Sequence, residues 1–170
     1  MKVSDAIAAF LARHVKHVFT VSGGADLHII HSLAKRSDIK FICPQHEQSA
    51  GFQADAYARL TGMGCALATS GPGATNLVTA IAASWYDSIP VLYLCGNQTI
   101  ARMDNHGTRG YGFQATPIVD IVRPITKWAK TLTSPVHVIA EMEQAVILAK
   151  SGRPGPVVCD LPDDLQRAEC

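Results

Sequence analysis

The chain has 170 residues, enough for one domain with a substantial apolar core. Apolar residues make up 48% of the chain and charged residues 17%, which excludes a disordered protein and leaves apolar surface for a partner to cover. The formal net charge is +1 and no lysine or arginine run occurs, which argues against nucleic acid or an anionic membrane as the main partner.

Helical and strand patterns alternate along the chain. Helical periodicity predicts helices at residues 3–14, 26–36, 46–61, 74–87, 116–122 and 135–150. Continuous apolar runs predict strands at residues 17–21, 40–43, 65–69, 91–95 and 156–160, with a further strand near 126–132. Such runs suit strands that helices cover on both faces. The pattern therefore predicts an α/β fold: one domain over residues 1–170, a three-layer αβα sandwich with a mainly parallel, about six-stranded sheet.

Glycine, proline and polar residues gather in the turns after four of the predicted strands, at residues 22–24, 44–47, 70–73 and 96–98. Because the carboxyl ends of parallel strands share one edge of a sheet, we expect these turns to converge on one crevice. The irregular segment at about 96–115 is rich in glycine and polar residues, and its length favours a functional loop.

Glu47 stands at the start of the predicted helix 46–61, directly after a predicted strand. An acidic residue in the first turn stabilises the helix dipole, and position alone favours this explanation. The same position also holds a carboxylate rigidly beside an apolar interior, where an acid or base can be tuned.

Residues 70–76 link a predicted strand to a predicted helix through Gly71 and Gly73. The segment contains half of a dinucleotide-binding fingerprint, but Asn76 replaces the third glycine and the acidic residue expected about twenty positions later is missing. A simple tight turn and an NAD-binding domain are both alternatives at this point.

Several motifs occur together in one order and spacing: residues 46–59, 69–79, 86–90, 113–114 and 152–157. With them the chain closely resembles the N-terminal, pyrimidine-binding domain of thiamine diphosphate-dependent enzymes, in the acetolactate synthase-like branch. The resemblance extends from about residue 3 to residue 165. It implies a lyase or transferase that decarboxylates or carboligates a small 2-oxo acid such as pyruvate.

The resemblance also implies roles for individual residues. Glu47 matches the catalytic glutamate that hydrogen-bonds N1′ of the cofactor's aminopyrimidine ring and favours the imino tautomer that deprotonates the thiazolium. Cofactor-binding positions are carried over to Ser22, Gly23, Gly24, Glu47, Thr69, Pro72, Asn76 and Gln114, and substrate positions to Phe113 and Gln114. The turn Val21-Ser22-Gly23-Gly24 and the loop 105–112 depart from the acetolactate synthase pattern, which leaves the exact substrate open.

The resemblance implies half of an active site. Family members hold the diphosphate through Mg²⁺ with a Gly-Asp-Gly segment on a separate domain, and this sequence contains none. We therefore expect a diphosphate-binding domain or subunit as partner, an inactive chain without it, and a homodimer or larger oligomer. Small residues on the predicted helix 46–61 (Ala50, Gly51, Ala54, Ala58) could pack across such an interface or within a monomer. The alternative is a non-catalytic assembly module.

Other polar residues allow two explanations each. His28 and His31 are spaced for one helix face, as metal ligands or as a solvated surface, and we predict no metal site. His46 could orient Glu47 or face solvent, and His106 and Arg109 could meet a substrate carboxylate or be ordinary surface charge. The cluster Asp160, Asp163 and Asp164 is interrupted by Leu161-Pro162, which favours a chain exit over a metal site.

Four cysteines, Cys43, Cys65, Cys95 and Cys159, lie in or beside apolar runs, and Cys170 ends the chain. No Cys-x-x-Cys pair, membrane-length apolar stretch or signal-like N-terminus occurs. We therefore expect buried, reduced thiols in a cytoplasmic protein.

Overall fold

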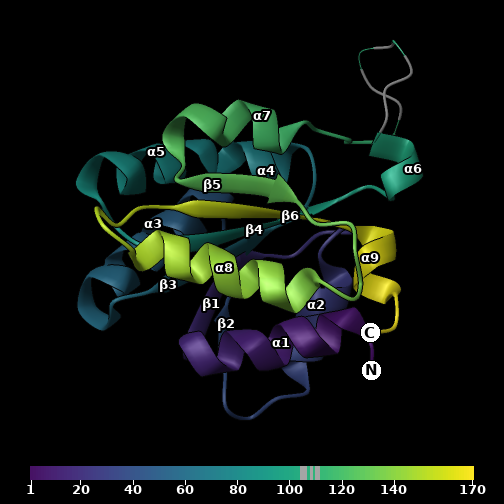
Figure 1. Ribbon diagram of the computed structural model, residues 1–170, viewed down its shortest axis with the longest axis horizontal. Helices are drawn as coiled ribbons and strands as arrows, with labels where there is room; N and C mark the ends of the chain where they lie inside the picture. Colours follow the sequence, from purple (N-terminus) through teal and green to yellow (C-terminus); the bar gives the residue numbers. More distant parts are fainter. Residues whose placement is uncertain (104–106, 108, 110–111) are drawn as a thin grey trace.

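The computed structural model contains a parallel sheet covered by helices on both faces (Figure 1). It describes residues 1–103, 107, 109 and 112–170. Within that part, six strands pair in the order β2-β1-β3-β4-β6-β5, and every pairing is parallel. The strands are β1 His17–Val21, β2 Lys40–Ile42, β3 Gly64–Ala68, β4 Val91–Asn97, β5 Trp128–Thr131 and β6 Val157–Pro162.

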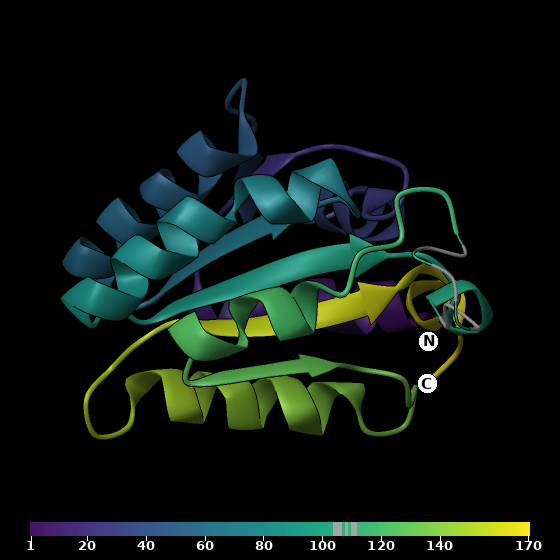
Figure 2. The same cartoon turned by 90° about the horizontal axis from the view of Figure 1, so that it is seen from above.

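Two apolar cores, one on each face of the sheet, make the fold three-layered. The first core packs α1 Val3–His14, α2 Leu27–Ala34, α8 Val138–Lys150 and α9 Asp163–Arg167 against the sheet. The second packs α3 Glu47–Thr61, α4 Pro72–Asn76, α5 Val78–Asp87 and α7 Ile118–Val122, which a 3₁₀ turn, η1 Arg123–Ile125, follows. Figure 2 shows α3 and α5, in blue and teal, side by side on one face, with α8 on the other. Neighbouring strand residues serve the two cores in turn, as in Cys65 and Ala66.

The predicted α/β sandwich is confirmed, and the uncertain strand near 126–132 is the edge strand β5. The predicted helix 74–87 is two helices, α4 and α5, that meet at Leu77. The predicted turn at 96–98 begins too early, because Gly96 and Asn97 still pair with β6. Two short helices, α6 Ile100–Met103 and α9, were not predicted.

The small residues of α3 pack inside the chain. Ala50, Ala54 and Ala58 are buried, and a Cβ on Gly51 would lie 2.5 Å from the Cβ of Ala80 on α5. Close packing of α3 against α5 within the monomer therefore accounts for this pattern, one of the two alternatives that the sequence left open.

All five cysteines are free, but the expectation that Cys43 is buried is wrong. Cys43 is exposed because it follows the short edge strand β2, which only β1 covers. Cys65, Cys95 and Cys159 are buried in β3, β4 and β6, and burial raises the pKa of each thiol. Within the described part of the chain, no helix has the length and apolar character needed to cross a membrane.

Candidate functional site

The turns at the carboxyl ends of β1 and β3 meet at Thr69. The amide of Ala25 donates a hydrogen bond of 3.0 Å to Thr69 Oγ1. A Cβ on Gly23 would lie 2.5 Å from the Cβ of Thr69, and one on Gly73 would lie 2.8 Å from its Cγ2. Both glycines are therefore required for Thr69 to fit between the two turns.

Glu47 is the first residue of α3, and its side chain borders the same turn. Its Oε2 accepts a 2.9 Å hydrogen bond from Nδ2 of Asn76 at the end of α4. Its Oε1 has no hydrogen bond among the described residues and lies 3.5 Å from the position that a Cβ on Gly73 would occupy. The half-buried carboxylate is thus fixed through one oxygen, and the other borders the Thr69 turn.

His46 caps α3 instead of orienting Glu47. Its ring Nδ1 accepts a hydrogen bond of 3.1 Å from the amide of Gln48, and the residue is otherwise exposed. The start of α3 is therefore fixed by the residue before Glu47, which leaves the Glu47 side chain available for other contacts.

Gln114 reaches the turn after β3. Gly71 has a φ of +64°, and a Cβ there would lie 2.7 Å from the Cβ of Gln114, so the two segments pack closely. Phe113, beside it, is 81% exposed. Ser22 and Pro72 are also exposed, at the margin of this region. The structure thus brings Gly23, Gly73, Thr69, Glu47, Asn76 and Gln114 to one edge of the sheet.

A cavity of about 460 Å³ opens at this edge. It is lined by the ends of β1, β3 and β4, the α6 segment and α9: Gly24, Ala25, Thr69, Ser70, Asn97, Gln98, Thr99, Arg102, Phe113, Gln114, Asp163 and Arg167. A larger cavity of about 600 Å³ lies among Trp85, Tyr86, Lys127 and residues 151–154. That cavity is at the amino ends of the strands, whereas Glu47 follows the carboxyl end of β2. We therefore place the site at the 460 Å³ cavity.

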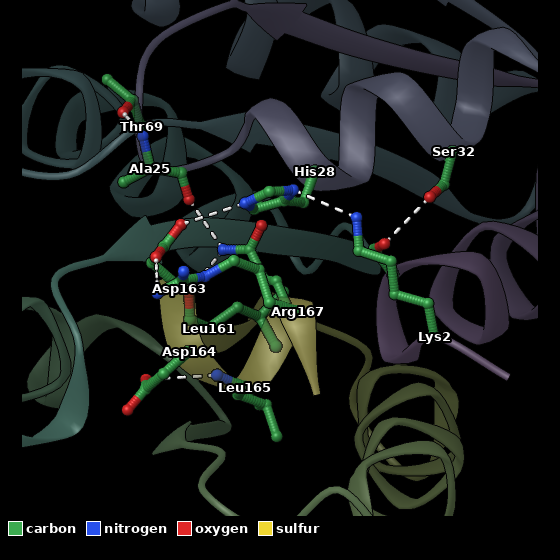
Figure 3. Close-up of polar contacts among 12 residues, drawn as sticks. Lys2, Ala25, His28, Ser32, Thr69, Leu161, Asp163, Asp164, Leu165 and Arg167 are labelled. Carbon is green, nitrogen blue, oxygen red and sulfur yellow. Dashed lines mark hydrogen bonds and ion pairs between the residues drawn. The ribbon is translucent and has the colours of Figure 1, made fainter. Parts of the chain in front are cut away.

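Two arginines in the cavity were not identified from the sequence. Arg102 has no ion-pair partner among the described residues, and Arg167 pairs with Asp163 at 2.8 Å. Figure 3 shows Asp163 between Arg167 and His28, whose Nε2 lies 3.4 Å from Asp163 Oδ1. Burial, together with the charge of Lys2, lowers the pKa of His28. Among the described residues that line the cavity, the ionic side chains are Arg102, Arg167 and Asp163, which together carry a net charge of +1.

Asp26 was also missed, because a carboxylate before a helix suggests an ordinary cap. The side chain makes no cap hydrogen bond. Its Oδ1 accepts a hydrogen bond of 2.8 Å from the Gly23 amide, and its Oδ2 has no hydrogen-bond partner among the described residues. The residue is fully buried, and burial raises the pKa of Asp26 to about 7, with a smaller contribution from the charge of Glu47.

The remaining acidic residues do not form a cluster. Asp160 is buried and accepts hydrogen bonds from Asn97 and Thr131, and burial raises its pKa to about 6. Asp164 accepts from the amide of Ile100. The described residues contain no group of three His, Cys, Asp or Glu side chains that could hold a metal ion.

Of the remaining loop candidates, His106 and Arg109, the structure describes only Arg109. His106 lies outside the described residues. Arg109 lines a separate cavity of about 290 Å³, together with Thr131 and Asp160. Arg109 is therefore not among the residues that line the 460 Å³ cavity.

Comparison with known proteins identifies the family of this chain. Residues 1–117 match the family described as thiamine pyrophosphate enzyme, N-terminal TPP binding domain. The chain is 43% identical over 168 residues to acetolactate synthase 2, chloroplastic, of Nicotiana tabacum, covering 98% of this chain and 24% of that protein. It is 42% identical over 164 residues to acetolactate synthase of Arthrospira platensis, covering 94% and 28% respectively.

The chain spans about a quarter of the length of the curated relatives it matches. Because the family match covers more than half of its residues, the chain belongs to the thiamine pyrophosphate enzyme family, as the N-terminal TPP-binding domain. The family match therefore argues against the alternative of an NAD-binding domain.

Proposed function

We propose that this chain, as the N-terminal domain of a thiamine pyrophosphate enzyme, is the aminopyrimidine-binding half of an active site that decarboxylates or carboligates a 2-oxo acid. The observation that carries the proposal is the pairing of Glu47 with Asn76 beside the Thr69 turn. One carboxylate oxygen is fixed, and the other, which has no hydrogen bond among the described residues, is available to a ligand beside the Thr69 turn.

The residues present fit the aminopyrimidine end of thiamine diphosphate. A carboxylate can share a proton with a ring nitrogen, and Gly23 and Gly73 let Thr69 pack between the turns that border this carboxylate. When bound, the cofactor supplies a thiazolium that stabilises the carbanion left by decarboxylation. Glu47 would hold a proton at Oε1, and Asn76 would keep Oε2 in place. Thr69, Pro72, Gln114 and the 22–24 turn would line the rest.

The cavity beside the Thr69 turn suits a small carboxylate. Arg102 and Arg167 can both donate to it, and the planar guanidinium group matches a carboxylate in a two-point hydrogen bond. Gln114 and Phe113 stand on its loop side, where they can contact the remainder of a 2-oxo acid.

The charged end of the cofactor requires a partner. This sequence has no Gly-Asp-Gly segment, so we propose that Mg²⁺ and the diphosphate are held by another domain or subunit and that the assembled enzyme is a dimer or larger. Cytoplasmic location is part of the same proposal and rests on the free thiols.

The Glu47→Gln variant tests the proposed role. Glutamine keeps the shape of the side chain but cannot take up the proton, so turnover of pyruvate by the chain combined with a diphosphate-binding domain should fall about 10²- to 10⁴-fold. Circular dichroism should show an unchanged fold. Glu143→Gln removes a half-buried carboxylate on α8, which packs on the opposite face of the sheet from α3, and should leave turnover unchanged.

Two outcomes would count against the proposal. Near-normal turnover by the Glu47→Gln variant would remove Glu47 from the chemistry. A wild-type combination that binds the cofactor but turns over no 2-oxo acid would instead favour the non-catalytic assembly module.

A further inference from the structure

Gln166 is a fully buried amide that joins α9 to the turn after β1. Its Nε2 donates to the carbonyl oxygen of Ala25 at 2.7 Å and to that of Leu161 at 2.8 Å. Ala25 lies 141 positions away in the sequence, and Figure 3 shows it close to Leu161 and α9. One side chain therefore connects the end of β6 to the wall of the cavity.

The other contacts of Ala25 leave its backbone little freedom. Its amide donates to Thr69 Oγ1, and a Cβ on Gly96 would lie 2.0 Å from its carbonyl oxygen. The carbonyl of Ala25 thus lies directly over the backbone of β4, with Gln166 as its hydrogen-bond donor. Holding the Ala25 carbonyl in place also holds the positions of Gly24 and Ala25, which line the cavity.

We propose that Gln166 is a positioning residue for the substrate side of the site, which it serves by holding the Gly24–Ala25 wall in place. The proposal rests on the function assigned above. Gln166 lies beyond residues 1–117, so the family match does not include it.

The polar contacts of Gln166 argue against a role as mere core filling. Its Oε1 is buried without a hydrogen-bond partner among the described residues, which is costly and which an apolar side chain of similar shape would avoid. The amide is therefore explained by what its N–H groups hold. Arg167 is the next residue and lines the cavity. The same contact therefore fixes the backbone position from which the Arg167 side chain extends.

Gln166→Met separates positioning from packing, because methionine has a similar length and no donor. Ser84→Ala is the matched control: it also removes two buried side-chain hydrogen bonds, to Asp55 and Tyr93, but does not contact the Ala25 turn. Hydrogen exchange of the chain by itself should show the Ala25 amide exchanging at least about tenfold faster in Gln166→Met than in the control. Amides in the centre of β4 should not differ in this way.

Kinetics of the chain combined with a diphosphate-binding domain supply the second readout. We expect the KM for pyruvate to rise at least about fivefold in Gln166→Met, with a smaller change in kcat, because the wall and not Glu47 is disturbed. Ser84→Ala should keep the wild-type KM. Exchange at Ala25 no faster than in the control, or an unchanged KM, would overturn the proposal. If the wild-type combination proves inactive, the function fails separately, and exchange still decides whether Gln166 holds the turn.

Discussion

Replacing Asp26 by asparagine should stabilise the folded chain above neutral pH. The carboxyl group is fully buried, with one oxygen bonded to Gly23 and the other without a partner among the described residues. Burial raises its pKa from 3.8 to about 7. A difference of about 3 pKa units corresponds to about 4 kcal/mol at about 1.4 kcal/mol per unit. Asparagine keeps the acceptor for Gly23 and carries no charge, so we expect a gain of about 2 to 4 kcal/mol at pH 8.

The direction of the pH dependence follows from proton binding. In the unfolded chain Asp26 ionises near pH 3.8, whereas in the folded chain it keeps its proton up to about pH 7. Between these values the folded state binds the additional proton, so its contribution to stability is largest at low pH and falls as the pH rises. The advantage of the variant should therefore be near zero below pH 3.8, grow up to about pH 7 and then level off.

Urea unfolding followed by circular dichroism measures this difference at a series of pH values. The control is Asp120→Asn, which removes an exposed carboxylate on α7 that pairs with Arg123. Its effect on stability should be small and nearly constant with pH. An advantage of Asp26→Asn that does not change between about pH 4 and 8 would refute the reasoning. So would a wild type that is the more stable protein at pH 8.

Two other predictions concern packing and exposure. Gly96→Ala should lower stability by more than about 3 kcal/mol in thermal unfolding, because its Cβ would collide with the Ala25 carbonyl. Gly24→Ala, with nothing within 4 Å of its Cβ, should change stability by less than about 0.5 kcal/mol; equal losses would contradict the packing argument. Cys43 and Cys170 should react with a disulfide reagent in the native protein, and the three buried thiols only after denaturation; a silent Cys43 would contradict its exposure.

Much of the fold could be predicted because its strands are covered on both faces. The runs that became β3 and β4 are apolar throughout, and that pattern identifies central parallel strands. The exact ends were less predictable. Asn97 stays in β4 because β6 continues beside it, and α9 forms after a Pro162 that suggested a chain exit. Both depend on contacts between segments far apart in the sequence.

The candidate site divides in the same way. Glu47, Thr69 and Asn76 were identified because they belong to motifs that a family resemblance can carry, and the structure brings them together. Asp26 and Gln166 were not identified, because nothing local distinguishes them from a helix cap and a surface glutamine. Their importance comes from burial against segments that the sequence does not place beside them.

Unpaired polar groups identify the same region without the motifs. Four buried side-chain atoms lack a hydrogen-bond partner among the described residues, and three of them lie at or near the end of β1: Thr20 Oγ1, Asp26 Oδ2 and Gln166 Oε1. Folded proteins rarely leave such groups unpaired, and those that remain concentrate where function opposes stability. Because Asp26 and Gln166 hold Gly23 and Ala25 through their other polar atoms, the unpaired atoms accompany contacts that shape the turn. The cost of burying these polar groups is therefore explained by a turn that must keep one conformation beside Glu47.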